Sequence, residues 1–206
     1  MTGSVVRAPW FLARCAQLAV PAAAGAELVR ALKVRAHLLH PSTSTAAESA
    51  RVSMLFVNVM TATVVLFLLW FARCRRNAEV LSPGRVPGSA AWAVLAWLIP
   101  VVNLWVPRGL VLDVHRASAP ADADEDRGNL LVNVWWAAWV GHAALNLAAM
   151  NLGYGTSLPP LVAAEALNLL AAVLATVLIQ RITVRQAARL GAGPQVPTPV
   201  DLPHAS

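Results

Sequence analysis

Charged residues are scarce in this chain of 206 residues, where Asp, Glu, Lys and Arg together make up 13%. Ordinary soluble domains carry about 25%. Hydrophobic residues make up 58%, and the mean hydropathy is +0.60. Most of the surface of a small domain stays in contact with water, so a soluble fold of this length has too little interior for these side chains. The composition excludes a soluble globular domain and a disordered chain, and it predicts a polytopic membrane protein.

Cysteine is also scarce, with only Cys15 and Cys74 in the chain and no C-x-x-C pair. This excludes a disulfide-rich scaffold and gives no indication of a zinc site. The sequence likewise lacks a phosphate-binding P-loop, an H-E-x-x-H helix and a G-x-S-x-G elbow. We therefore expect no metal and no cofactor, and we consider an enzyme less favoured than a non-enzymatic protein.

Long apolar runs are what the chain does contain. A helix needs about 20 apolar residues to cross the hydrocarbon core, and only helices satisfy their own backbone groups there within one segment. A weaker fourth span, Trp10–Val29, carries Arg14 and Glu27 near its ends. We predict an all-α membrane protein with four transmembrane helices, the three stronger spans being Val52–Phe71, Leu130–Met150 and Leu158–Gln180.

The segment Val86–Pro107 is uncharged for 22 residues but is broken by proline. Basic loops favour the cytoplasmic side, and both Arg73–Arg85 and the stretch after Gln180 are rich in arginine. With the uncharged turn Asn151–Ser157 outside, both ends of the broken segment lie inside, so we predict a re-entrant or interfacial piece. If it spans instead, the basic loop Arg30–Arg51 moves to the inside.

The whole of residues 1–190 is predicted to be one membrane domain of the bacterial plasma membrane with both termini in the cytoplasm. Residues 191–206 contain four prolines and two glycines, which is typical of a disordered tail. The net charge of +6 is carried beside the apolar runs. This favours anionic lipid at the cytoplasmic face, and a protein partner there, over nucleic acid.

The stretch Trp70–Ser118 resembles the DUF4328 family of bacterial membrane proteins, which are common in actinobacteria. The resemblance implies membrane location and architecture only, since the family is named for an unknown function. It rests on an Arg-Asn-Ala element, a Trp-x-x-Pro-x-x-Asn-Leu-x-x-Pro element and a following Asp and Arg, which are here Arg76, Asn77 and Ala78; Trp97, Pro100, Asn103, Leu104 and Pro107; and Asp113 and Arg116.

These motif residues have two interpretations. A proline break frees backbone groups, and such backbone occurs at membrane depth only where protein or a watery cavity surrounds it. Asn103 could therefore lie in a ligand pocket. The alternative, which we weigh more heavily, is that Pro100 and Asn103 shape a structural hairpin and the arginines bind lipid phosphate.

A second group comprises His142, Asn146 and Glu165. His142 and Asn146 share a helix face, and their depth predicts that they meet Glu165 across the last helical hairpin, with Glu27 near the same level. Ionisable groups in a membrane usually mark function, which suggests proton coupling. The alternative, which we weigh more heavily, is a polar clamp between helices.

For function, the sequence favours a membrane scaffold or interaction subunit. The alternative from a different class is a small proton-coupled transporter or channel component that uses His142 and Glu165, and a membrane-embedded enzyme ranks third.

Overall fold

The computed structural model describes residues 7–120 and 125–191, and the predicted tail beyond residue 191 lies outside them. The described residues form helices and their connections. The α-helices are α1 (Trp10–Leu39), α2 (Thr43–Leu81), α3 (Ala90–Leu95), α4 (Val106–Ala117), α5 (Glu125–Asn151) and α6 (Leu158–Gly191), with short 3₁₀ turns at Val102–Leu104 (η1) and Tyr154–Thr156 (η2).

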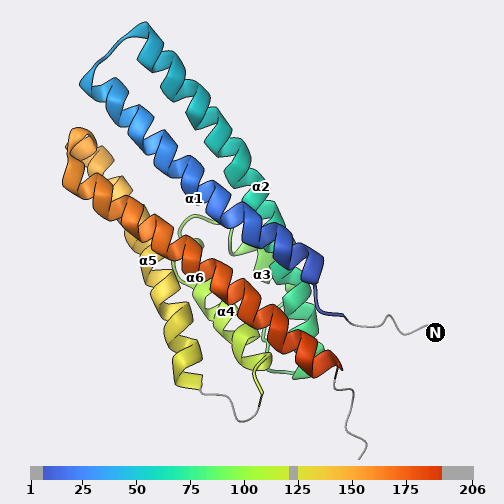
Figure 1. The fold of residues 1–206 in the computed structure, drawn as a ribbon. Coiled ribbons are helices and arrows are strands. Elements are labelled where there is room, and N and C mark those ends of the chain that lie inside the picture. Colours follow the sequence, from blue (N-terminus) through green and yellow to red (C-terminus); the bar gives the residue numbers. More distant parts are fainter. Residues whose placement is uncertain (1–6, 121–124, 192–206) are drawn as a thin grey trace, which may run out of the picture.

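The long helices form two antiparallel hairpins, α1 with α2 and α5 with α6, and α1 and α6 lie side by side between them (Figure 1). The two short interhelical connections meet at one end of the bundle, where Nε of Arg35 donates to the carbonyl of Thr156 at 3.1 Å. At the opposite end, Asn77 Nδ2 donates to the carbonyl of Arg7 and to Gln186 Oε1. The start of α1, the end of α2 and the end of α6 therefore lie together.

Three helices, α2, α5 and α6, are long and apolar enough to cross a membrane. The predicted runs 52–71, 130–150 and 158–180 lie inside these helices, and run 10–29 lies inside α1. The helices continue well past the runs. Hydropathy marks only the apolar part of a helix, so polar turns that extend it leave no signal in an apolar window.

One predicted loop is wrong for this reason. Residues 30–51 were expected to connect two spans, but α1 continues to Leu39 and α2 begins at Thr43. The start of α2 is set by a capping box, in which the Ser42 hydroxyl accepts from the Thr45 amide at 3.1 Å and the Thr45 hydroxyl accepts from the Ser42 amide. This reciprocal pairing satisfies two otherwise unpaired donors, so the helix starts far ahead of its apolar run.

Residues 82–117, here called the central hairpin, leave the end of α2 and return to the same end of the bundle. The Ser82 hydroxyl donates to the carbonyl of Ala117 at 3.1 Å. Between these ends the chain reaches inward to Trp97, whose ring packs on Phe67 and Phe71 of α2 and on Trp135 of α5. The hairpin thus fills the space between α2 and α5 from one end.

The entrance of the central hairpin is held by a buried arginine. Nη2 of Arg75 donates to the carbonyls of Val86, Pro87 and Gly88, at 3.0 Å for Pro87. Gly88 has a φ of 85°, a left-handed conformation that glycine adopts without steric cost. Further along, Pro107 is the second residue of α4, where its missing amide costs no helical hydrogen bond.

Candidate functional site

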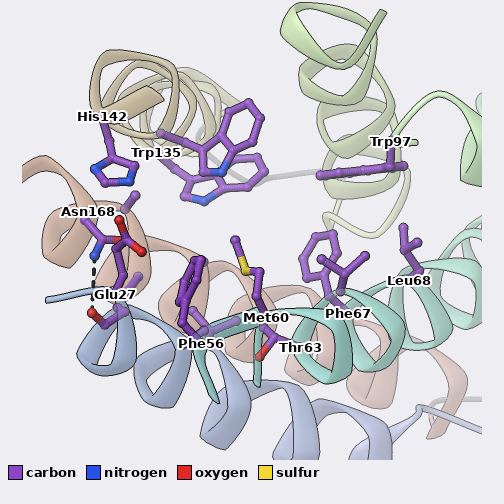
Figure 2. Close-up of a pocket in the computed structure, with 18 of the residues that line it drawn as sticks. Glu27, Phe56, Met60, Thr63, Phe67, Leu68, Trp97, Trp135, His142 and Asn168 are labelled. Carbon is purple, nitrogen blue, oxygen red and sulfur yellow. Dashed lines mark hydrogen bonds between the residues drawn. The ribbon is translucent and has the colours of Figure 1, made fainter. Parts of the chain in front are cut away.

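A cavity of about 210 Å³ lies between α1, α2, α5, α6 and the central hairpin. Figure 2 shows that one end of it is polar and the remaining wall is largely aromatic and apolar. The wall includes Phe56 and Met60 from α2 and Trp139 from α5, and small alanines from α1 and α6 leave the space open. A bundle interior lined in this way is a common position for small-molecule sites.

Three side chains define the polar end, Glu27 from α1, His142 from α5 and Asn168 from α6. The carboxylate of Glu27 points toward the imidazole of His142 (Figure 2), and Glu27 is only 4% exposed. One turn along α1, Nε of Arg30 donates to Glu27 Oε2 at 2.7 Å. Asn168 Nδ2 donates to the carbonyl of Ala24 at 3.3 Å, which ties α6 to α1.

The predicted group His142, Asn146 and Glu165 is located beside this end. His142 Nδ1 lies 2.9 Å from the carbonyl of Ala164, and Asn146 Nδ2 lies 3.1 Å from His142 Nε2. Glu165 is buried and its Oε2 accepts from Asn168 at 3.2 Å. His142 therefore contacts α6 at the backbone of Ala164, the residue before Glu165. The Glu165 carboxylate pairs instead with Asn168.

Sequence reasoning missed Asn168 and Arg30. Asn168 stands three residues after Glu165, which is the helical spacing at which side chains meet, so that signal was present. Arg30 was assigned to a loop, although it stands three residues after Glu27 on the continuous helix α1.

The aromatic part of the cavity is built around Trp97. Its ring centroid lies 4.9 Å from that of Phe67 and 6.4 Å from that of Trp135. Trp97 Nε1 and Asn103 Oδ1 are buried without a hydrogen-bond partner in the part of the chain that the structure describes. Both residues line the cavity, so two residues of the central hairpin that carry an unused donor and an unused acceptor border the same space.

The remaining motif residues separate into different environments. Asn77 is buried and donates to Gln186 Oε1 at 3.1 Å, while Gln186 Nε2 donates to the Cys74 carbonyl and the Ser118 hydroxyl. Arg76 next to it is exposed. Asn77 and Pro107 are thus buried inside the protein, whereas Pro100 lies on an exposed turn. Asp113 is half-buried, and the exposed Arg116 donates to Asn129 Oδ1 at 3.0 Å.

A second cavity of about 370 Å³ opens at the end of the bundle where the central hairpin begins and ends, and Arg85, Arg116 and Arg189 line it. Arg189 Nη1 donates to the carbonyl of Ala117 at 2.7 Å. Arg189 therefore holds the end of the central hairpin and also borders this cavity.

His115 of α4 is 3% exposed, and its Nε2 accepts from Arg185 Nη1 at 2.9 Å. Burial, together with the guanidinium groups of Arg185, Arg181 and Arg116, lowers the pKa of His115 to about 4. On the same helix, burial raises the pKa of Asp113 against the opposing effect of Arg116 and Arg75.

The described part of the chain is thus a helical bundle with three helices apolar enough to cross a membrane and, between its helices, a cavity with one polar end. The family model described as "Domain of unknown function (DUF4328)" matches residues 35–184. The chain belongs to this family, as its motif residues indicated. No curated protein and no solved structure matches the chain.

Proposed function

We propose that this protein binds a small, mainly apolar molecule in the cavity beneath the central hairpin and serves as a small transporter or channel component. The observation that carries this proposal is that Trp97 and Asn103, which both line the cavity, each carry a buried polar atom, Nε1 and Oδ1, that has no hydrogen-bond partner among the described residues. A buried polar group without a partner costs about 1–3 kcal/mol. A ligand that accepts one hydrogen bond and donates one removes both costs.

The size of the cavity supports a ligand with a single ring. A dry protein cavity of about 150 Å³ binds benzene, and this one measures about 210 Å³. The aromatic side chains of Phe67, Trp135 and Trp139 supply stacking faces for such a ring. The scaffold function that the sequence favoured needs no cavity of this kind, so the geometry favours the alternative.

The topology belongs to the same proposal: four spanning helices in the bacterial plasma membrane, with the central hairpin re-entering from the cytoplasmic side. Its support is that Ser82 and Ala117 meet at the bundle end where Arg85, Arg116 and Arg189 line one cavity, since positive charge favours the inside. The fourth span is α1, which packs along α2 and α6.

Thiol labelling in intact cells tests this topology. In a variant without Cys15 and Cys74, we expect Arg85→Cys and Asp126→Cys to resist an impermeant maleimide, while Asn151→Cys at the other end reacts. All three positions are exposed in the structure. Labelling of Arg85→Cys with protection of Asp126→Cys would contradict the re-entrant hairpin.

Ligand binding is tested with 4-ethylbenzamide, whose amide donates and accepts hydrogen bonds and whose ring is uncharged. We expect it to raise the thermal stability of the protein in lipid nanodiscs. Trp97→Phe removes the donor and is expected to weaken binding about tenfold, which corresponds to about 1.4 kcal/mol. Trp105→Phe, at a position 65% exposed, is the matched control. Equal binding by Trp97→Phe and the unchanged protein would refute the proposal.

A second candidate function, recognition of anionic lipid, is favoured by the cavity lined by Arg85, Arg116 and Arg189. Guanidinium groups bind phosphate through paired hydrogen bonds. We expect nanodiscs of phosphatidylglycerol to stabilise the protein more than phosphatidylcholine does. The double variant Arg85→Gln, Arg116→Gln should lose this difference, whereas Arg51→Gln at an exposed position should keep it.

A further inference from the structure

Resting on the proposed function, we infer that the cavity opens sideways to the membrane through a gap between α2 and α5, and that its ligand is an uncharged, lipid-soluble molecule that enters from the hydrocarbon of the bilayer. The cavity is a half-open cleft and not an enclosed void. The direction in which it opens follows from the sides of the bundle that are closed.

Both ends of the bundle are joined by hydrogen bonds between helices and connections. At the end with the two short interhelical connections, Arg35 donates to the carbonyl of Thr156. Further along α1 toward the cavity, Arg30 pairs with Glu27, which is only 4% exposed. At the opposite end, Gln186 of α6 donates to the backbone of α2 and to the residue that follows α4. Among the described residues, the bundle axis is therefore a poor route from water to the cavity.

Most sides of the bundle are closed by helix packing. The helix α1 packs along α2 and α6, and α5 packs along α6. In the part of the chain that the structure describes, α2 and α5 do not pack along each other. The central hairpin reaches between them from one end, where Trp97 packs on Phe67 of α2 and on Trp135 of α5. Beyond the hairpin, the side between α2 and α5 is the one left open.

The residues that border the cavity on this side are apolar or aromatic. On α2 they include Met60 and Val64, which line the cavity and are also exposed, and on α5 they include Trp135 and Trp139. Only 6% of the apolar window of α2 is buried inside the protein. The cavity wall on α2 thus continues into an exposed apolar surface, which is typical of a membrane contact. At membrane depth, the gap faces acyl chains.

A lateral route selects the ligand by its solubility in lipid. Charged groups are costly in the hydrocarbon core, so the gap admits uncharged molecules that partition into the bilayer. Inside the cavity, such a molecule meets Trp97 and Asn103, which carry the unused donor and acceptor. Without a ligand, an acyl chain of a lipid enters the same space, because about 210 Å³ exceeds the volume of a cavity that holds benzene.

Photo-cross-linking of the full chain in nanodiscs tests the inference. The probe is a phosphatidylcholine with a diazirine in the middle of one acyl chain, and mass spectrometry locates the cross-links. We expect cross-links at Ala171 and Ala175, which are buried and line the cavity from α6, in addition to cross-links at Val173, which is exposed on the same helix. Cross-links confined to outward residues such as Val173 would overturn the inference.

A pair of neighbouring variants provides the matched control. Ala172→Phe places a ring in the cavity, whereas Val173→Phe adds the same ring at an exposed position. We expect Ala172→Phe to lose the cross-links at Ala171 and Ala175, and Val173→Phe to keep them. If Ala172→Phe does not fold, the cross-link map of the unchanged protein still decides the question.

Competition with 4-ethylbenzamide separates this inference from the proposed function. We expect 4-ethylbenzamide to displace the cross-links at Ala171 and Ala175, while those at Val173 persist. Cavity cross-links that it does not displace would support the lateral opening and contradict the proposed ligand chemistry. A protein that 4-ethylbenzamide stabilises, but whose cross-links are confined to outward residues, would keep the proposed function and overturn the lateral opening.

Discussion

Asn77 on α2 and Gln186 on α6 are joined by a buried hydrogen bond of 3.1 Å between Nδ2 and Oε1, across 109 residues of sequence. Gln186 in turn donates to the Cys74 carbonyl at 2.8 Å and to the Ser118 hydroxyl at 2.9 Å. One buried amide therefore links α2, α6 and the residue that follows α4. This gives the asparagine of the Arg-Asn-Ala element a structural explanation.

Replacement of Asn77 by leucine is expected to destabilise the protein. The variant leaves Gln186 Oε1 buried without its donor, which costs about 1–3 kcal/mol. For a protein of this size each kcal/mol lowers the Tm by roughly 2–4 °C. Thermal unfolding in detergent measures the change. Arg76→Gln is the neighbouring control, since Arg76 is exposed, and a loss as large in that variant would contradict the explanation.

Replacement of Gly128 by alanine is expected to disturb the contact between α5 and α4. A Cβ at this position would lie 2.3 Å from Cε1 of His115, which is buried. Overpacking of this kind costs about 1–3 kcal/mol. Gly109→Ala is the matched control, because a Cβ there meets no atom within 4 Å. Equal thermal stability of the two variants would show that His115 moves aside without cost.

Stability is expected to decrease as the pH falls from 6.5 toward 4, with His115 responsible for part of the slope. Its pKa is lowered from 6.5 to about 4 in the folded protein, so in this interval the unfolded chain binds a proton that the folded one does not. Wherever the unfolded state binds more protons than the folded state, the stability of the fold rises with pH. Once protonated, Nε2 of His115 would also no longer accept the hydrogen bond from Arg185.

The His115→Gln variant isolates this contribution, because glutamine does not titrate. We expect a smaller decrease in its Tm between pH 7 and pH 5 than in the unchanged protein. His40→Gln, at an exposed position, should retain the full decrease. Parallel pH profiles for all three proteins would exclude His115 as the source.

Arg75→Gln is expected to loosen the entrance of the central hairpin. Hydrogen bonds from charged groups contribute about 1.5–3 kcal/mol, and Arg75 Nη2 donates to three consecutive carbonyls there. Hydrogen exchange of residues 82–89 should accelerate on the order of 10- to 100-fold, since local opening sets its rate. Arg73→Gln, two residues earlier and exposed, should leave the exchange rate unchanged.

The long helices could be predicted because their cause is local. Runs such as Val52–Phe71 are apolar throughout, and a backbone without water satisfies its own hydrogen bonds only as a helix. The ends were missed because they depend on single side-chain contacts, such as the capping box of Ser42 and Thr45. The pairing of His142 with Asn146 followed from helical spacing, whereas the pairing of Asn168 with Glu165 was overlooked at the same kind of spacing.

Composition and short-range spacing were enough to predict the family, the helical character and the proline-broken segment, because these features are local in the chain. The three-dimensional fold was needed to show that Trp97 and Asn103 border the same cavity as Glu27, and that Asn77 contacts Gln186. Those relationships join distant segments, and they depend on how side-chain volumes pack between helices. Packing of that kind depends on all contacting residues at once and leaves no periodic pattern in the chain.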